Sequence, residues 1–305
     1  LVGVAIEGAT GKAWSLDSNS RAPAAAHEHM YEVGPVAAGQ ANGLNANEYD
    51  CAVADDSNVY GPLAVGVPGQ LAGLGTLNER WGRLPWSQVV QPSLDLLSNG
   101  VAFGEGLAGS VRSLEAVIRR YPASAAHLLP HDSLPKPESI WHRPDMERTL
   151  ERLAAAGWRD FYEGAVAGAI VDALAAGGGI LTRKDMADFE PRITDPYAAA
   201  YRGAEVLGSI LPNGPISVLQ ALNMLDCFDP LAVDDVGWWH RMTEVLKRVW
   251  RDRLTYLADP DYADVPVERL LNRDYARGLT EELRQFPEAV DTRPFAAGGG
   301  VPETS

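Results

Sequence analysis

The stretch that decides the fold is residues 61–103, which read GPLAVGVPGQLAGLGTLNERWGRLPWSQVVQPSLDLLSNGVAF. Its apolar run from Leu63 to Val67 stops at Pro68-Gly69, a pair that is typical of turns. Apolar residues at helical spacing follow as far as Trp81, and a second helical pattern covers residues 89–97. We therefore predict a buried strand, a tight turn and two successive helices.

Composition and charge exclude several classes of function. The chain has 305 residues, of which 46% are hydrophobic, so it can bury a substantial core. Its formal net charge is −15, and it has no cluster of Lys or Arg that could neutralise phosphates. We therefore expect no nucleic-acid partner. No run reaches the ~18 apolar residues of a membrane span, so we expect no membrane span either.

Cysteine and histidine spacing does not indicate a metal site. Cys51 and Cys227 lack C-x-x-C spacing, which excludes a zinc knot and argues against a disulfide framework, and we expect two buried thiols. The sequence His27-Glu28-His29 offers two imidazoles, but no third ligand follows at a recognisable spacing. His240 and Glu244 lie four residues apart, and here we expect an ordinary helical hydrogen bond. Neither G-x-G-x-x-G nor G-x-x-x-x-G-K-[ST] is present, so we predict no cofactor. Because no complete set of ligands is recognisable, we also predict no metal.

Four further patterns predict local structure. We expect a hairpin at the start of the chain, because Val2, Val4 and Ile6 place apolar side chains at alternate positions and a Gly-containing turn precedes a second strand. The stretch 34–58 indicates a long surface loop. We predict a helix over residues 107–120, a longer one from Trp238 to Leu257, and a capping box that pairs Thr182 with Asp185.

The quoted stretch resembles the large subunit of the gamma-glutamyltransferase (gamma-glutamyltranspeptidase) family of N-terminal-nucleophile hydrolases. Residues 64–69 are similar to the family's A-V-x-V-P-G run, and residues 84–93 are similar to its L-P-W-x-x-V-x-Q-P-S run. The resemblance implies an α/β (α+β) fold, an αββα sandwich shared by two chains, with this chain as the helix-rich large subunit. It also implies that residues 1–285 are the large-subunit part of one domain, and that residues 286–305 are a flexible tail before a self-cleavage site.

The resemblance places the nucleophile outside this chain. In the family, a Thr freed by self-cleavage opens the small subunit, and its own α-amine can act as the base. We therefore expect no catalytic residue here, unless Thr304 already belongs to the cleavage motif. The implied partners are a small subunit from the same precursor, forming a heterodimer, and a small-molecule amide substrate. The implied chemistry explains why the chain shows no Ser/His/Asp arrangement.

The substrate-binding motif departs from the family pattern. The family's L-D-F-R-E-x-A-P motif uses its Arg to bind the α-carboxylate of a glutamyl group, and the matching residue here is Asn19. A neutral amide does not replace a bidentate, charge-assisted guanidinium. Arg21 lies ~6–7 Å further along an extended chain. We expect Asn19 and Arg21 to be the substrate-binding candidates, with a non-glutamyl acyl group and water as acceptor, as in the similar cephalosporin acylases and oxamate amidohydrolases.

Three alternatives stay open at this point. An inactive relative that acts as a binding or scaffold protein would show the same motifs. A true gamma-glutamyl transferase acting on glutathione-like peptides is the second alternative. A metal-dependent hydrolase would need His27, His29 and a distant carboxylate. The sequence leaves the cellular compartment undetermined.

Overall fold

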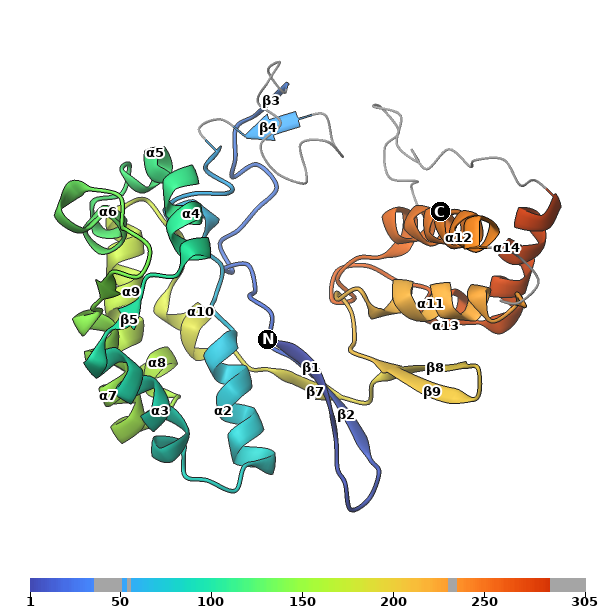
Figure 1. The fold of residues 1–305 in the computed structure, drawn as a ribbon, viewed down its shortest axis with the longest axis horizontal. Helices are drawn as coiled ribbons and strands as arrows, with labels where there is room; N and C mark the ends of the chain where they lie inside the picture. Colours follow the sequence, from blue (N-terminus) through green and yellow to red (C-terminus); the bar gives the residue numbers. More distant parts are fainter. Residues whose placement is uncertain (36–50, 54–55, 230–234, 286–305) are drawn as a thin grey trace. The chain divides into compact units, whose positions relative to one another are not determined.

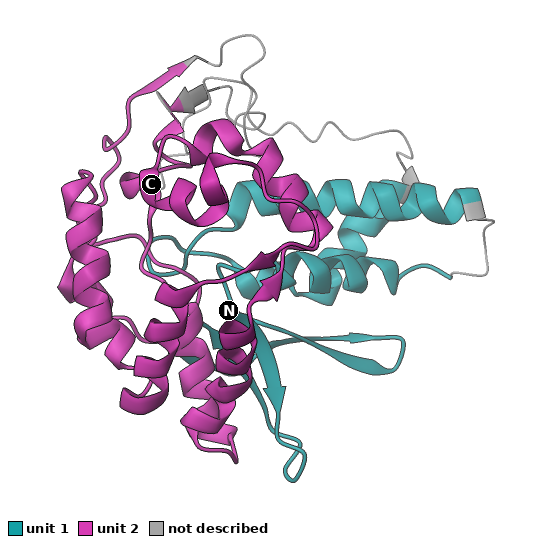
Figure 2. Ribbon diagram, turned by 60° about the vertical axis from the view of Figure 1, so that its left-hand side comes forward, with its two compact units in different colours: residues 1–17, 192–305 teal, residues 18–191 magenta. Residues whose placement is uncertain are grey.

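The computed structural model describes residues 1–35, 51–53, 56–229 and 235–285 (Figure 1). The chain divides into two compact units, which Figure 2 colours separately. Unit 1 comprises Leu1–Asp17 and Arg192–Ser305, and unit 2 comprises Ser18–Pro191. The predicted tail, residues 286–305, lies outside the described residues, and so does Thr304. Most of the loop predicted over residues 34–58 is also undescribed.

Unit 1 begins with the predicted hairpin. Strands β1 (Val2–Ile6) and β2 (Ala13–Asp17) pair antiparallel from Val2 opposite Asp17 to Ile6 opposite Ala13, and β7 (Arg192–Thr194) pairs with the other edge of β2. A second hairpin joins β8 (Tyr197–Tyr201) to β9 (Ala204–Gly208). Its two turn residues have φ values of 49° and 81°, and the second of them is Gly203, which adopts this region without steric cost.

Most helices of unit 1 pack around one apolar cluster, and a second buried cluster includes Leu270. Buried side chains such as Met224, Val245 and Leu279 form the first cluster, together with Ala276 and Phe228. The helices are α11 (Pro215–Leu225), α12 (Asp235–Tyr256), α13 (Val267–Leu270) and α14 (Arg273–Gln285). The longest helix is therefore within three residues of the predicted span of residues 238–257.

The predicted contact between His240 and Glu244 is wrong. Glu244 is only 2% exposed, and its carboxylate accepts hydrogen bonds from Lys247 at 2.8 Å and from Arg248 at 3.1 Å. His240 is exposed on the same helix. A buried carboxylate needs charged partners, and here two cations further along α12 supply them.

Unit 2 is mainly helical. A cluster that includes Trp158, Tyr162, Met186 and Phe189 forms one of its cores. Its elements in chain order are β3 (Val33–Pro35), β4 (Cys51–Val53), η2 (Pro62–Ala64), α2 (Gln70–Trp81), α3 (Trp86–Asn99), β5 (Val101–Ala102), α4 (Glu105–Ser113), α5 (Glu115–Ile118), α6 (Pro122–Leu128), η3 (Pro130–Asp132), β6 (Ile140–Trp141), α7 (Pro144–Ala156), α8 (Asp160–Glu163), α9 (Ala165–Ala176) and α10 (Arg183–Ala187).

Two local predictions for unit 2 need correction. The predicted strand over residues 63–67 is a short 3-10 helix, Pro62–Ala64, followed by an extended segment in which Val67 forms an isolated bridge with Arg21. Pro62 sets a helical φ at the first position, so the run turns before it extends. The single helix predicted over residues 107–120 is interrupted at Leu114, which separates α4 from α5. The two helices predicted after the turn are confirmed as α2 and α3.

Cys227 is half-buried and its thiol donates to the Asn223 carbonyl at 3.4 Å, which corrects the expectation of a fully buried one; the side chain of Cys51 is not described. Within residues 1–35, 51–53, 56–229 and 235–285, none of the helices combines the length and apolar character that a membrane crossing requires.

Candidate functional site

The candidate site is the segment 18–21 of unit 2, which contains both sequence-predicted residues, Asn19 and Arg21. This segment follows β2 and runs antiparallel to the residues before α2. The Arg21 amide donates to the Val67 carbonyl at 3.4 Å, and the Val67 amide donates to the Arg21 carbonyl at 2.8 Å. This bridge fixes the backbone two residues beyond Asn19. We call residues 18–21 the recognition segment.

Two glycines allow the recognition segment to lie directly against the turn before α2. A Cβ on Gly69 would lie 2.2 Å from the Ser18 carbonyl oxygen and 2.9 Å from that of Asn19. A Cβ on Gly66 would lie 2.9 Å from the Arg21 carbonyl oxygen. Real Cβ atoms do not approach so closely, so both positions require glycine. Gly66 and Gly69 thus have a steric explanation, which is the close approach of two backbones.

Tyr162 holds this turn through its hydroxyl group. Its hydroxyl donates to the Pro68 carbonyl at 2.7 Å and accepts from the Ala72 amide at 2.9 Å. Its ring stacks on Phe189, with centroids 5.9 Å apart and planes 11° apart. Burial raises the pKa of Tyr162 to about 12, although the hydrogen bond from the Ala72 amide acts in the opposite direction. The phenol therefore stays neutral and keeps its donating proton at physiological pH.

Sequence reasoning missed this role of Tyr162. The F-Y-x-G pattern at residues 161–164 marks the residue, but nothing in the spacing shows that its hydroxyl reaches a turn about 90 residues earlier. The Ala72 amide belongs to the first turn of α2, where the amides have no partner within the helix. Tyr162 therefore supplies a hydrogen bond that Gly69, the residue before the helix, has no side chain to make.

The two predicted substrate-binding residues differ in their surroundings. The Arg21 guanidinium donates from Nη2 to the Glu190 carbonyl at 2.9 Å and lies 5.1 Å from the centroid of the Phe189 ring. These contacts direct it toward residues 189–190. Asn19 is exposed, whereas the preceding Ser18 is only 1% exposed. The structure thus brings both residues onto one fixed segment, with Arg21 engaged by neighbouring protein groups.

Helix α10 fixes the chain just after the recognition segment. The Asp185 carboxylate accepts from the Ala24 amide at 2.9 Å and from the Thr182 hydroxyl at 2.6 Å, and the predicted capping box is confirmed. Burial favours a higher pKa for Asp185. The hydrogen bonds from the Thr182 hydroxyl and from the Ala24 and Thr182 amides outweigh burial, with help from the Lys184 charge, so this pKa is lowered. The carboxylate is therefore ionised near neutral pH and holds both groups.

No metal site is indicated in the described part of the chain. There, no three His, Cys, Asp or Glu side chains gather closely enough to hold an ion. His27 and His29 are both exposed, and His29 lies 3.2 Å from the neighbouring Glu28 carboxylate. Among the described residues, no further ligand joins the pair that the metal-dependent alternative requires.

Comparisons with known proteins agree with the resemblance of the motifs. A family model described as gamma-glutamyltranspeptidase matches residues 2–294. The chain is 30% identical over 293 residues to the "Acylase ACY 1 proenzyme" of Pseudomonas sp. (strain SE83), covering 95% of this chain and 50% of that protein. It is 28% identical to the "Glutathione hydrolase proenzyme" of Pseudomonas aeruginosa, covering 92% and 47% respectively. The chain thus spans about half the length of these curated relatives.

Solved structures show the same fold. Gamma-glutamyltranspeptidase from Helicobacter pylori matches with a TM-score of 0.86 at 23% identity, covering all of this chain and 83% of the solved one. Cephalosporin acylase from Bacillus halodurans matches with a TM-score of 0.75 at 25% identity, covering 90% of this chain and 49% of the solved one. The expected N-terminal-nucleophile hydrolase fold class is thereby confirmed. Because the family model covers nearly the whole sequence, this chain belongs to the gamma-glutamyltranspeptidase family.

Proposed function

We propose that this chain supplies the large-subunit part of an N-terminal-nucleophile amidohydrolase. In this proposal residues 1–285 belong to one catalytic domain that a small subunit from the same precursor completes, and residues 286–305 lead to the self-cleavage site. Family membership supports the assignment. So does the name "proenzyme" of relatives that are about twice as long as this chain.

The proposed reaction needs a threonine that opens the small subunit, or Thr304 if the cleavage motif begins there. Its hydroxyl attacks the carbonyl carbon of the amide, and its α-amine takes the hydroxyl proton and returns a proton to the departing amine. Water then attacks the acyl-threonine ester, which releases the acid and restores the hydroxyl. The role of the present chain is to bind and orient the acyl group.

The observation that carries the substrate proposal is the fixed position of Asn19. The recognition segment is held by the bridge to Val67 and by backbone packing on Gly66 and Gly69. A segment fixed in this way presents the Asn19 amide at the position where the family's L-D-F-R-E-x-A-P motif has an arginine. An amide forms weaker hydrogen bonds to a carboxylate than a charged fork does. We therefore propose an acyl group other than gamma-glutamyl, such as a glutaryl or oxamic group.

Arg21 is the second substrate-binding residue of this proposal. Its hydrogen bond to the Glu190 carbonyl uses Nη2, and a guanidinium has five N–H donors. It can therefore keep this bond and still bind a carboxylate at the far end of a glutaryl chain. Water as the acceptor agrees with the name of the acylase relative and is part of the same proposal.

The test compares a glutaryl anilide with a gamma-glutamyl anilide, two chromogenic amides that share the terminal carboxylate and differ only in the α-amino group. Protein produced from the complete gene should cleave the glutaryl anilide with a kcat/KM at least about tenfold above that for the gamma-glutamyl anilide. Equal values would contradict the proposed preference for a non-glutamyl acyl group. Absence of cleavage of both anilides and of oxamic amides would instead favour the inactive binding-protein alternative.

A further inference from the structure

Unit 2 contains a pocket of ≈ 570 Å³ that the proposed function does not use. It lies between α2 and α7, and we call it the α2–α7 pocket. Most of its wall is apolar, contributed by Leu71, Leu74, Met146, Leu150, Leu153, Phe161, Val166 and Ile170. Its volume lies within the ~300–1,000 Å³ range of small-molecule sites. The described part of unit 2 thus contains a cavity of the size and character of a ligand site.

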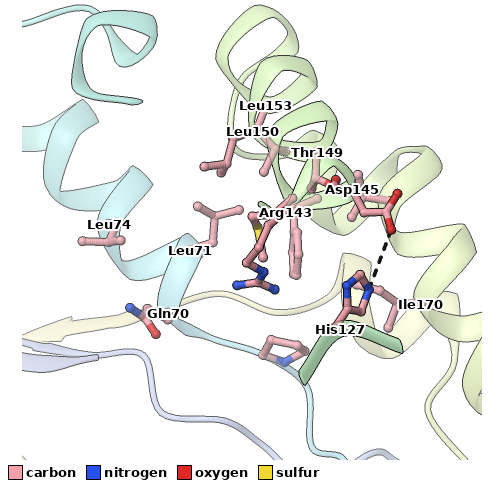
Figure 3. A pocket seen from close by; sticks show the side chains of 14 residues that line it. Gln70, Leu71, Leu74, His127, Arg143, Asp145, Thr149, Leu150, Leu153 and Ile170 are labelled. Atoms are coloured by element: carbon pink, nitrogen blue, oxygen red, sulfur yellow. Dashed lines mark hydrogen bonds and ion pairs between the residues drawn. The ribbon is translucent and has the colours of Figure 1, made fainter. Parts of the chain in front are cut away.

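One cation extends into this apolar space. Figure 3 shows the Arg143 side chain reaching between Leu71 and His127. Its Nε is buried and has no hydrogen-bond partner, and its guanidinium carbon lies 4.8 Å from the centroid of the Trp141 ring. A buried N–H group without a partner destabilises the folded state, so an acceptor that fills this position would be favoured.

The nearest carboxylate of the pocket is already engaged. Asp145 pairs with Arg148, and its Oδ2 lies 3.7 Å from His127 Nε2 at the edge of the pocket (Figure 3). Among the residues that the structure describes, no carboxylate forms an ion pair with Arg143. The pocket therefore has a free guanidinium charge toward its interior and a neutralised acid at its rim.

The start of α7 adds a second feature that favours an anion. Arg143 is the residue before this helix, and its side chain makes no capping hydrogen bond to the first turn. Asp145 and Met146, whose amides belong to that turn, both line the pocket. Helix amides without intrahelical partners carry partial positive charge. The Arg143 guanidinium and the start of α7 thus lie at the same end of the pocket.

We propose that the α2–α7 pocket binds a small monocarboxylate with an apolar body, such as an aryl-alkanoate, with its carboxylate on Arg143. The apolar body fills the space lined by Leu71, Leu150 and Ile170. A planar carboxylate matches the fork of a guanidinium, which is why this class fits better than a neutral apolar molecule. The proposal concerns binding alone, so its outcome is independent of the proposed hydrolysis.

The first experiment titrates the protein from the complete gene with 4-phenylbutyrate and, separately, with the neutral amide 4-phenylbutanamide, measured by isothermal titration calorimetry. We expect saturable binding of the acid and at least about tenfold weaker binding of the amide, because a charge-assisted hydrogen bond is lost. Absence of saturable binding, as when another part of the protein fills the pocket, would overturn the proposal, and so would equal affinities.

Three variants locate the site. Arg143→Gln should weaken phenylbutyrate binding at least about tenfold, while Arg143→Lys should keep part of the affinity because the charge remains. Leu150→Trp should abolish binding by filling the cavity with Arg143 intact. The matched control is Arg112→Gln, which removes an exposed arginine of α4 outside the pocket. Unchanged binding in both Arg143→Gln and Leu150→Trp, or equal weakening in the control, would overturn the assignment.

Discussion

The Gly69→Ala substitution tests whether the glycines of the turn exist for backbone contact. Gly69 has φ −103° and ψ −16°, values that alanine adopts without strain. Dihedral strain is therefore absent, and in the folded state the substitution adds only the steric effect of one methyl group. This methyl carbon would meet the carbonyl oxygens of Ser18 and Asn19 at 2.2 and 2.9 Å and the Phe189 ring at 2.6 Å.

The expected magnitude follows from these three contacts. Inserting a methyl group into a well-packed site costs about 1–3 kcal/mol, occasionally more. Two of the obstructing atoms at Gly69 are backbone atoms, which cannot rotate away as a side chain can, so we expect the upper end of the range. The reduced entropy of the unfolded chain returns about 0.4–1 kcal/mol. The net destabilisation is then about 2 kcal/mol, or a melting temperature lowered by roughly 4–8 °C.

The assay is thermal unfolding followed by circular dichroism, with Gly109→Ala as the matched control. Gly109 lies inside α4 of the same unit, and a Cβ there would have nothing within 4 Å. The control should raise the free energy of unfolding by about 0.5–1 kcal/mol, as alanine does in helix interiors. If the recognition segment moves aside instead, the stability change shrinks but kcat/KM for the acyl substrate falls. Gly69→Ala protein that keeps both wild-type stability and wild-type kcat/KM would refute the reasoning.

Three further substitutions test the same site. Tyr162→Phe should lower the free energy of unfolding by about 2–4 kcal/mol, because it leaves the buried Ala72 amide and the half-buried Pro68 carbonyl without their partner; urea unfolding measures this, and a loss below about 0.5 kcal/mol would contradict it. Asp185→Asn should destabilise the protein by about 1 kcal/mol at pH 7. Because the pKa of Asp185 is lowered in the folded state, its contribution is complete above the unfolded value and is lost as the pH falls through the folded one. The difference between wild type and variant should therefore shrink in acid, and a difference that stays constant down to acid unfolding would argue against the account. Asn19→Arg should raise kcat/KM for a gamma-glutamyl anilide about tenfold, through a bidentate pair with the α-carboxylate; Ser20→Arg, at the exposed neighbouring position, should have no such effect, and equal gains would exclude a specific role for residue 19.

The sequence predicted elements better than it predicted contacts. The helical spacing after Pro68-Gly69 and the pairing of Thr182 with Asp185 were both readable, because each depends on residues close in the chain. The apolar run before the turn was misread as a strand. Its residue Val67 does form a bridge, but with Arg21 alone, and a proline at the start of the run bends the chain.

Long-range contacts explain what sequence reasoning missed at the site. The sequence shows the A-V-x-V-P-G run, but the physical reason for Gly69 depends on Ser18 and Asn19, which approach it only in the folded chain. Glu244 could likewise have paired with several residues on α12, and burial decided in favour of Lys247 and Arg248. Periodicity gives the exposed face of a helix, whereas the partner of a buried charge depends on tertiary packing.

The most direct test of the central claim is the intact mass of the protein made from the complete gene, with N-terminal sequencing of every chain in it. The account predicts two chains, one containing the sequence described here and one that begins with threonine. Replacing that threonine with alanine should leave a single uncut precursor. A single uncut chain in the wild-type protein, or a second chain that begins with another residue, would contradict the assignment as an N-terminal-nucleophile hydrolase that activates itself.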